Sequence, residues 1–219
     1  MKYTPQNFIK FAIENEVLSF GEFKTKAGRL SPYFFNAGKF NSGHTLWSLA
    51  QFYAQHIIDS KIKFDVLFGP AYKGITLASS TACAINQING DDIPFCFNRK
   101  EAKNHGEGGV LVGASLKNKR VLIIDDVISA GTSIQESISM IKAADGTPCG
   151  VVIALDRMEK SGNDEEIGKF SAIQQIEHDF NLPVTAIINL NELLAYVASE
   201  KNLHIHQNSI QNYKNKYGV

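Results

Sequence analysis

Two adjacent carboxylates, Asp125 and Asp126, follow an aliphatic run at 121–124 and precede a stretch of small residues at 129–133. The continuous β-branched and aliphatic run is typical of a strand covered on both faces, and isoleucines spaced over 134–141 indicate a helix beyond the loop. Such a loop aims backbone N–H groups and a helix N-terminus at one point, which binds phosphate. The carboxylates can hold sugar hydroxyls or a Mg²⁺ that the phosphates carry. This stretch therefore favours a sugar phosphate as ligand.

Two other interpretations compete for the same stretch. An aliphatic strand that ends in two acids also occurs as the metal-holding strand of P-loop ATPases, but that class needs a G-x-x-x-x-G-K-[ST] loop. The nearest candidate, residues 162–169, has five residues between its glycines and Phe170 after its lysine, so we reject it. The second alternative is an acidic strand end with a helix cap and no ligand.

Length, charge and cysteine usage bound the class of protein. The 219 residues can bury one sizeable core, or a core plus a small appended subdomain. Lys plus Arg equals Asp plus Glu at 22 each, so charge gives no argument for a nucleic-acid or membrane partner. No apolar run approaches the ~20 residues of a membrane span, and the N-terminal stretch lacks a signal-peptide core. Three distant cysteines in apolar contexts indicate small buried residues in a reducing compartment, so we expect a cytoplasmic protein.

A second loop of the same kind follows the apolar stretch at 64–69, which we expect to be another buried strand. The loop comprises residues 70–74, includes Lys73 and leads into a helix that runs to about residue 88. A lone lysine in a loop is usually solvated. Two such loops at one edge of a parallel sheet would nevertheless form a crevice, because ligands in open α/β sheets bind beyond the carboxyl ends of the strands.

Helices and strands alternate around these two loops. Thr4 and Pro5 begin a helix in the preferred way, with a capping hydroxyl and a proline at the first helical position. No internal repeat or linker divides the chain, so one domain over residues 1–219 is the economical interpretation. We expect further helices at 43–60, 171–181 and 190–200, strands at 20–26, 93–97, 151–155 and 184–188, a turn at 27–29, a polar loop at 161–168 and a polar tail at 203–219.

Two further segments carry residue types that suit a planar, acidic ligand, although each has an ordinary structural explanation. The aromatic stretch at 31–36 is either normal strand packing or a flat wall and backbone edge for a planar ring. Arg157 stands at the tip of the strand at 151–155, where an arginine suits bidentate carboxylate recognition. The alternative for Arg157 is a simple surface ion pair with Asp156 or Glu159.

A cationic segment at 98–109 combines four positively chargeable side chains with three glycines and has no apolar anchor. We expect it to be mobile when empty. It is either a solvated surface loop or a cationic lid over an anionic substrate. An out-and-back excursion of roughly 17 Å would let such a lid cross a subunit boundary.

The stretch at 125–133, which reads DDVISAGTS, is similar to the phosphoribosyl diphosphate (PRPP) motif of type I phosphoribosyltransferases. From about Phe20 to Arg157 the chain resembles the orotate phosphoribosyltransferases, because residues 26–36 look like their orotate-side element and residues 99–108 like their catalytic loop. A purine phosphoribosyltransferase would share only the first motif. The resemblance implies an α/β fold of the type I phosphoribosyltransferases: a central, mostly parallel sheet flanked by helices, with a small hood formed largely by about residues 1–40 plus C-terminal elements.

The activity that the resemblance implies is Mg²⁺-dependent transfer of ribose 5-phosphate from PRPP to orotate. The products are orotidine 5′-phosphate and diphosphate, in the synthesis of UMP. Mg²⁺ would be held mainly through PRPP and diphosphate, with no firm protein ligand. The enzyme would be a homodimer whose lid residues act in the neighbouring subunit's site.

The resemblance also assigns roles to single residues. Ser129 stands where the family commonly has threonine, and it retains the hydroxyl that can bond to orotate. The residues assigned to orotate are Lys26, Phe34, Phe35, Ser129 and Arg157. Those assigned to PRPP are Asp125 and Asp126 at the ribose; Val127, Ile128, Ser129, Ala130, Gly131, Thr132 and Ser133 around the 5′-phosphate; and Lys26, Tyr72, Lys73, Arg99, Lys100, Lys103 and His105 at the diphosphate.

The physical demands of this reaction agree with those roles. Breaking the bond from ribose C1 to diphosphate builds positive charge on the sugar, as in glycoside hydrolysis, and negative charge on the leaving group. Fixed cations aimed at the diphosphate stabilise that separation. Lys103 is the first candidate for this role, and His105 is a candidate proton donor. Two rivals stay open: a phosphoribosyltransferase for another base, and a non-catalytic PRPP-sensing regulator.

Overall fold

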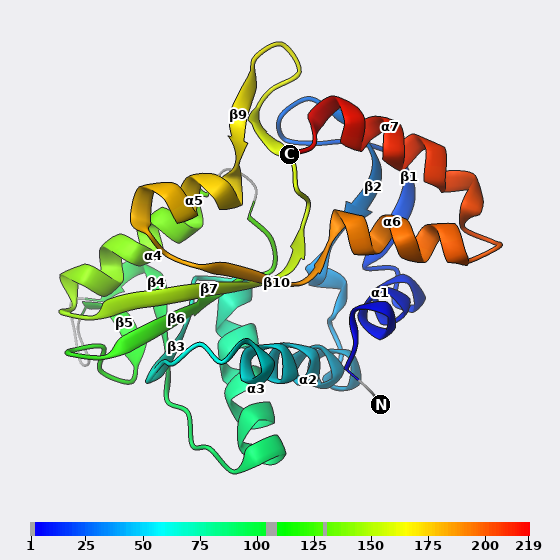
Figure 1. The fold of residues 1–219 in the computed structure, drawn as a ribbon. Helices are drawn as coiled ribbons and strands as arrows, with labels where there is room; N and C mark the ends of the chain where they lie inside the picture. Colours follow the sequence, from blue (N-terminus) through cyan, green and yellow to red (C-terminus); the bar gives the residue numbers. More distant parts are fainter. Residues whose placement is uncertain (1–2, 104–108, 129–130) are drawn as a thin grey trace.

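The protein is organised around one six-stranded sheet, seen in a computed structural model that describes residues 3–103, 109–128 and 131–219 (Figure 1). The strand order is β10-β7-β6-β3-β4-β5, and every neighbouring pair is parallel except β4 and β5. The predicted α/β fold with a central, mostly parallel sheet is confirmed. Its strands are β3 (Val66–Gly69), β4 (Phe95–Lys103), β5 (Gly109–Gly113), β6 (Arg120–Ile124), β7 (Thr147–Asp156) and β10 (Val184–Asn189).

Helices cover both faces of this sheet. Successive residues of a strand point to opposite faces, and in β6 both sets of side chains are apolar. On β6, Leu122 and Ile124 belong to the apolar cluster of helices α2 (Gly43–Ser60) and α3 (Lys73–Asn89). Their neighbours Val121 and Ile123 belong instead to the cluster of α4 (Thr132–Ala143) and α5 (Ala172–Phe180). The continuous aliphatic run of β6 is therefore buried on both faces, as the sequence predicted.

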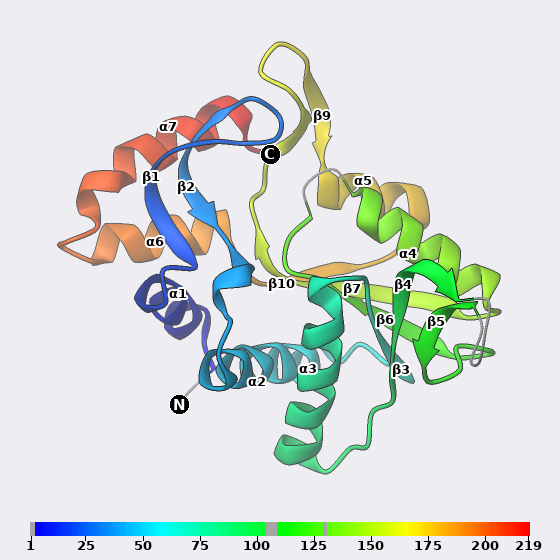
Figure 2. The same ribbon diagram turned by 180° about the vertical axis from the view of Figure 1, so that it is seen from behind.

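A second group of elements gathers at the β10 side of the sheet. The antiparallel hairpin of β1 (Leu18–Lys24) and β2 (Leu30–Phe35) lies there with α1 (Pro5–Glu14), α6 (Leu190–Ser199) and α7 (Gln207–Tyr217) (Figures 1 and 2). Helix α1 begins as predicted, because the Thr4 hydroxyl accepts the Asn7 N–H at 3.3 Å. Two short 3₁₀ turns, Ala37–Lys39 and His204–His206, complete this part. It joins the first and last parts of the chain around a shared aromatic core.

The predicted loop at 98–109 is wrong for its first half. Residues up to Lys103 belong to β4, which continues six residues beyond the expected strand end at 97. The physical reason is the partner strand: β5 returns antiparallel to β4, with Asn98 opposite Leu111 and Lys103 opposite Gly109. Backbone pairing thus orders a polar segment that offers no apolar periodicity.

Two polar segments near the end of the chain are also more regular than predicted. The expected loop at 161–168 is a hairpin of β8 (Lys160–Gly162) and β9 (Ile167–Ser171). The expected tail at 203–219 contains α7, which buries Ile210, Tyr213 and Tyr217 on one face. That helical spacing was present in the sequence, but the polar residues around it concealed it.

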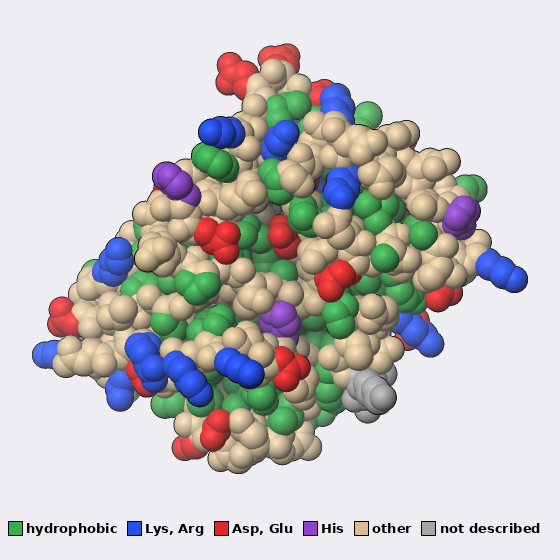
Figure 3. Space-filling model, in the orientation of Figure 1, with side chains coloured by type: hydrophobic (Ala, Val, Ile, Leu, Met, Phe, Trp, Pro, Cys, Tyr) green, Lys and Arg blue, Asp and Glu red, His purple; other side chains and the backbone are tan. Residues whose placement is uncertain are grey.

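The surface agrees with the balanced charge of the chain. On the face shown in Figure 3, acidic and basic side chains are interspersed, apart from a group of Lys and Arg side chains at the lower left. Within the described residues, no helix combines the length and the apolar character needed to cross a membrane. The expectation of three buried cysteines was wrong for Cys83, which is exposed, whereas Cys96 is buried.

Candidate active site

Asp125 and Asp126, called the acidic tip below, lie at the carboxyl end of β6, where both carboxylates are largely shielded from solvent. Asp125 is 9% exposed and Asp126 is 7% exposed. Asp125 Oδ1 accepts the Asp126 N–H at 2.9 Å, and Asp126 Oδ1 accepts the Val127 N–H at 2.9 Å. The Ser133 hydroxyl donates to Asp125 Oδ2 at 3.3 Å. These bonds fix both side chains at the entrance of the β6–α4 loop.

The pKa of the Asp125 carboxyl is raised well above its ordinary value. Burial and the adjacent charge of Asp126 raise its pKa to about 7, despite hydrogen bonds from the Asp126 N–H and Ser133 and the positive charge of Lys73. Hydroxyl groups that donate to the ionised carboxylate would favour that form.

A second loop, between β3 and α3, meets the acidic tip. Lys73 Nζ lies 2.5 Å from Asp126 Oδ2, and the lysine side chain is still 53% exposed. Two glycines allow the tight turn: a Cβ on Gly69 would lie 1.9 Å from the Gly74 carbonyl oxygen, and one on Gly74 would lie 2.7 Å from the Gly69 carbonyl carbon. The two predicted loops therefore do meet at one edge of the sheet.

The N-terminus of α4 completes this edge. Gly131 precedes the helix with φ +77°, a left-handed conformation that glycine adopts without strain. No side chain of the described residues caps this end of α4. Its first backbone N–H groups are therefore available to a ligand, and the helix dipole favours an anion there.

A cleft of about 710 Å³ opens between these elements. Lys100 on β4 holds its Nζ 5.0 Å above the ring of Tyr72, which is 69% exposed. The Ala71 N–H donates to the side-chain oxygen of Asn98 at 2.8 Å, which ties the β3–α3 loop to β4. The cleft thus collects groups predicted to contact PRPP, and its lining includes Ala71, Asn98, Arg99, Lys100, Thr132 and Ser133.

Arg157 forms the centre of a second polar group, beyond the end of β7. Its Nε donates to Glu159 Oε2 at 2.9 Å and its Nη2 donates to the Ser31 hydroxyl at 3.1 Å. The guanidinium carbon lies 4.5 Å above the ring of Tyr33. An ion pair with Glu159 was the structural alternative for Arg157, and it is present. It is mostly buried, however, with 16% of the arginine side chain exposed.

The aromatic stretch on β2 divides between two roles. Tyr33 and Phe35 are buried, and the Phe35 ring lies 6.4 Å from Phe8 in the core. Phe34 is 46% exposed, with its ring stacked on Phe23 at 5.4 Å. The ring of Phe35 is therefore a core side chain rather than part of a substrate wall, because strand alternation turns it inward. Only Phe34 presents an accessible ring.

The structure describes the remaining predicted residues only in part. Lys26 is exposed in the β1–β2 turn, away from any ion pair of the described residues. His105, Ser129 and Ala130 lie outside the described residues, as does the side chain of Lys103. Val127 and Ile128 lead from the acidic tip toward α4, and Ile128 packs into the apolar cluster of that helix.

Sequence reasoning missed several residues that support these two groups. Arg29 is 1% exposed, and it donates to Glu159 Oε1 at 3.0 Å and to the Lys160 carbonyl at 2.7 Å. Tyr53 on α2 donates to the Asp125 carbonyl at 2.8 Å. These partners stand 130, 131 and 72 positions apart, so no local pattern could have identified them.

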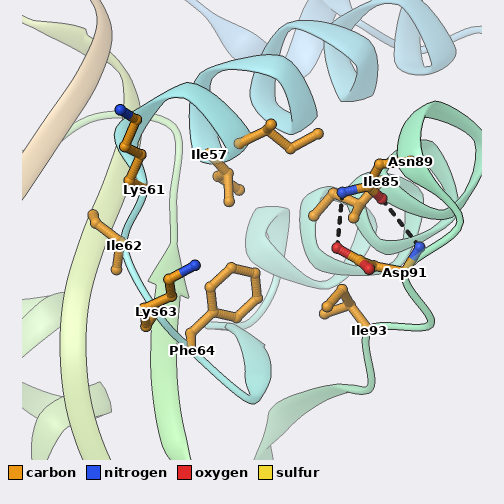
Figure 4. A pocket seen from close by; sticks show the side chains of 10 residues that line it. Ile57, Lys61, Ile62, Lys63, Phe64, Ile85, Asn89, Asp91 and Ile93 are labelled. Carbon is orange, nitrogen blue, oxygen red and sulfur yellow. Dashed lines mark hydrogen bonds between the residues drawn. The ribbon is translucent and has the colours of Figure 1, made fainter.

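Another cavity, of about 290 Å³, lies at the opposite end of the sheet (Figure 4). It is lined mainly by apolar side chains from the segments that precede β3 and β4, including Ile57, Phe64 and Ile93. Asp91 at its rim hydrogen-bonds to Asn89. Because ligands of parallel sheets bind at the carboxyl ends of the strands, this cavity is not the candidate active site.

Comparison with known proteins shows similarity over nearly the whole chain. The model of the phosphoribosyl transferase domain family matches residues 38–183. An orotate phosphoribosyltransferase of Herminiimonas arsenicoxydans is 57% identical over 217 residues, which cover 98% of this chain and 97% of that protein. One from Cupriavidus necator is 56% identical over 216 residues, covering 98% and 94%. The crystal structure of an orotate phosphoribosyltransferase from Francisella tularensis is 44% identical, with a TM-score of 0.86, and covers 97% of this chain and 100% of that one.

Proposed function

The chain belongs to the orotate phosphoribosyltransferases within the phosphoribosyl transferase family, and from that premise we propose which of its residues carry the reaction. The reaction transfers the 5-phosphoribosyl group from PRPP to orotate and yields orotidine 5′-phosphate and diphosphate, a step of pyrimidine biosynthesis. One observation carries the residue assignment. The contact of Lys73 with Asp126 brings two loops together beside the uncapped N-terminus of α4.

The ribose and its 5′-phosphate bind at the β6–α4 loop. Asp125 and Asp126 accept hydrogen bonds from the ribose hydroxyls, and this is supported by their burial and by the raised pKa of Asp125. The 5′-phosphate accepts from the backbone N–H groups between Ser129 and Ser133, at the start of α4. This arrangement holds the sugar still while the bond at C1 breaks, which lowers the entropic part of the barrier.

The diphosphate binds across the cleft between the β3–α3 loop and β4. Arg99 and Lys100 line this cleft, Tyr72 lies beneath Lys100, and Lys73 follows Tyr72 at the start of α3, so these four residues supply donors there. Lys103 follows on β4 and stabilises the charge that develops on the leaving group. His105 is the proposed proton donor to that group, because a histidine changes charge near neutral pH.

Orotate binds on the Arg157 side, where its carboxylate pairs with the guanidinium and its ring lies against Phe34 and the backbone edge of Phe35. The mostly buried, already oriented Arg157 supports this assignment. Lys26 in the neighbouring turn and the hydroxyl of Ser129 contact the ring from the PRPP side. No strong protein base is needed, because the orotate ring is itself acidic.

The acidic tip fits Mg²⁺ only as part of a shared site. Two adjacent carboxylates offer the hard oxygen atoms that Mg²⁺ prefers, but the described residues contain no group of three His, Cys, Asp or Glu side chains that could hold a metal alone. PRPP would therefore supply most of the ligands. When bound, Mg²⁺ neutralises part of the diphosphate charge and aligns the leaving group.

The protein works as a homodimer in this proposal, and the part of the β4–β5 hairpin beyond Lys100, which includes Lys103, serves the neighbouring subunit's site. The position of β4 and β5 at one side of the sheet, with β5 as the edge strand, supports this. The length of the hairpin is enough to cross a subunit boundary. A cytoplasmic location stays a prediction from the sequence.

The experiment that tests the proposed function is the consumption of orotate with and without PRPP and Mg²⁺. We expect consumption only when both are present, and no comparable turnover of hypoxanthine or uracil. Turnover of another base instead of orotate would mean a phosphoribosyltransferase of different specificity. PRPP binding without turnover of any base would point to the regulatory alternative.

A further inference from the structure

The guanidinium of Arg157 is held on three sides by the protein. Its Nε donates to the Glu159 carboxylate, its Nη2 donates to the Ser31 hydroxyl, and the ring of Tyr33 lies beneath it. In the part of the chain that the structure describes, Nη1 donates no hydrogen bond. Burial would lower the pKa of Arg157, but the surrounding acidic groups raise it above its ordinary value, so the side chain stays charged. One edge of a fixed cation is thus left for a ligand.

Glu159 is the residue that sets this orientation, and it has a second set of partners. Its Oε1 accepts from Arg29 Nη1 at 3.0 Å and from the Tyr213 hydroxyl at 2.5 Å. Burial alone would raise the pKa of Glu159, but the charge of Arg157 and these hydrogen bonds lower it below its usual range. One carboxylate therefore stands between two guanidinium groups, and the trio keeps a net charge of about +1, which matches a ligand carboxylate.

Helix α7 supplies the remaining constraints on this trio. Tyr213 is 6% exposed and packs edge-on against Tyr33, with ring centroids 6.4 Å apart. The backbone after α7 pairs with the segment that follows Arg157: the Val219 N–H donates to the Met158 carbonyl at 3.0 Å, and Gly218 forms a β-bridge with Glu159. Helix α7 packs against β2, which carries Ser31 and Tyr33, and Figures 1 and 2 show it beside the β1–β2 hairpin. The last helix thus holds Glu159 through both its side chain and its backbone.

We propose that Tyr213 is a positioning residue for the orotate side of the site, acting through Glu159 on the guanidinium of Arg157. This inference rests on the proposed function, in which Arg157 binds the orotate carboxylate. The Tyr213 hydroxyl keeps the Glu159 carboxylate turned so that its second oxygen meets Arg157 Nε. Loss of the hydroxyl lets the carboxylate rotate and the guanidinium leave its place on Tyr33.

The helix offers a matched control in Tyr217. Its hydroxyl also donates to a carboxylate, that of Asp164, and its ring packs on Tyr213 at 4.8 Å. Tyr217 is 4% exposed, so the two tyrosines are buried alike. Asp164 pairs with Lys216 rather than with Arg157. Loosening of α7 would therefore affect both variants, whereas loss of positioning would affect only one.

The test measures KM for orotate and for PRPP in Tyr213→Phe, Tyr217→Phe, Arg157→Ala and Tyr213→Phe/Arg157→Ala. We expect Tyr213→Phe to raise KM for orotate about 3–10-fold, the effect of one lost hydrogen bond of ordinary strength, with KM for PRPP changed less than twofold. Tyr217→Phe should change both less than twofold. In the double variant, Tyr213→Phe should add nothing to the effect of Arg157→Ala, because the two act through one contact.

Three outcomes distinguish failure of this inference from failure of the proposed function on which it rests. If Arg157→Ala leaves KM for orotate unchanged, the assignment of Arg157 and the inference fail together. If Arg157→Ala raises it while Tyr213→Phe does not, only the inference fails. Equal effects of the two tyrosine variants, or additive effects in the double variant, would show general docking of α7 and would also overturn it.

Discussion

The two polar groups of the proposed active site, named the PRPP side and the orotate side after their proposed ligands, are built in opposite ways. On the PRPP side, Asp125 and Asp126 are neighbours in the chain, carry like charges and share one partly exposed lysine. On the orotate side, Arg157 and Arg29 come from distant segments and share a buried carboxylate, Glu159. The first group places two like charges side by side, whereas the second pairs opposite charges.

This difference means that the first group should contribute mainly to ligand affinity and the second mainly to the stability of the fold. Two adjacent, largely buried like charges cost folding free energy, and a ligand that donates hydrogen bonds to them would recover part of it on binding. A closed network of ion pairs instead fixes the local structure, and breaking it exposes uncompensated buried charge. Substitutions on the two sides should therefore change stability in opposite directions.

The largest expected effect is the loss of stability in Arg29→Met. The change leaves three backbone carbonyls, those of Lys160, Ser161 and Asn163, without the guanidinium and removes one cation from Glu159. We expect the free energy of unfolding to fall by about 3 kcal/mol, measured by urea denaturation. The exposed Lys26 in the same turn gives the matched control, and Lys26→Met should change it by less than about 0.5 kcal/mol. Equal small effects would mean that the network is not structural.

Next in size is the effect of Lys103→Ala on turnover. Removing a donor to a developing anion costs about 3 kcal/mol, so kcat should fall on the order of 100-fold while PRPP still binds. Single-turnover kinetics and PRPP titration measure the two quantities. Unchanged kcat would remove Lys103 from the mechanism. Mixed with Asp125→Asn subunits, the variant should regain activity if the lid serves the neighbouring site.

Arg157→Ala should have a smaller effect, confined to the other substrate. Loss of a charge-assisted contact of about 2 kcal/mol should raise KM for orotate roughly 30-fold, because the carboxylate loses its cation. KM for PRPP should stay within about threefold of the parent value. Steady-state kinetics with each substrate varied in turn gives both constants. Equal losses for the two substrates would contradict the division of the site.

The smallest effect is a gain in stability in Asp125→Asn. The folded-state pKa of Asp125, about 7, lies above its ordinary value of 3.8, so folding favours the protonated form and stability falls as the pH rises from about 4 through 7. Asparagine avoids that loss. We expect Tm to rise by about 2–4 °C at pH 8, a gain of roughly 1 kcal/mol, and by less at pH 5. A gain that is independent of pH, or a loss at pH 8, would contradict the raised pKa.

The same contrast explains what the sequence could reveal. The PRPP side is local: a strand, two acids, small residues and a helix follow one another from Arg120 to Ala143, so type and order could be predicted. Apart from the Arg157–Glu159 ion pair, which the sequence had offered as an alternative, the orotate side is joined across 126 to 131 positions, and those partners became visible only in the fold. The inward direction of the Phe35 ring was missed for the same reason, since two neighbouring phenylalanines do not reveal which one faces the core. The β4 extension was missed because backbone pairing, not apolar periodicity, orders it.

The most direct test of the central claim is a crystal structure of the protein with PRPP and Mg²⁺. The account predicts the ribose hydroxyls on Asp125 and Asp126, and the 5′-phosphate on the backbone at the start of α4. It also predicts the diphosphate between the β3–α3 loop and β4. PRPP bound elsewhere, with the acidic tip and the start of α4 empty, would contradict it.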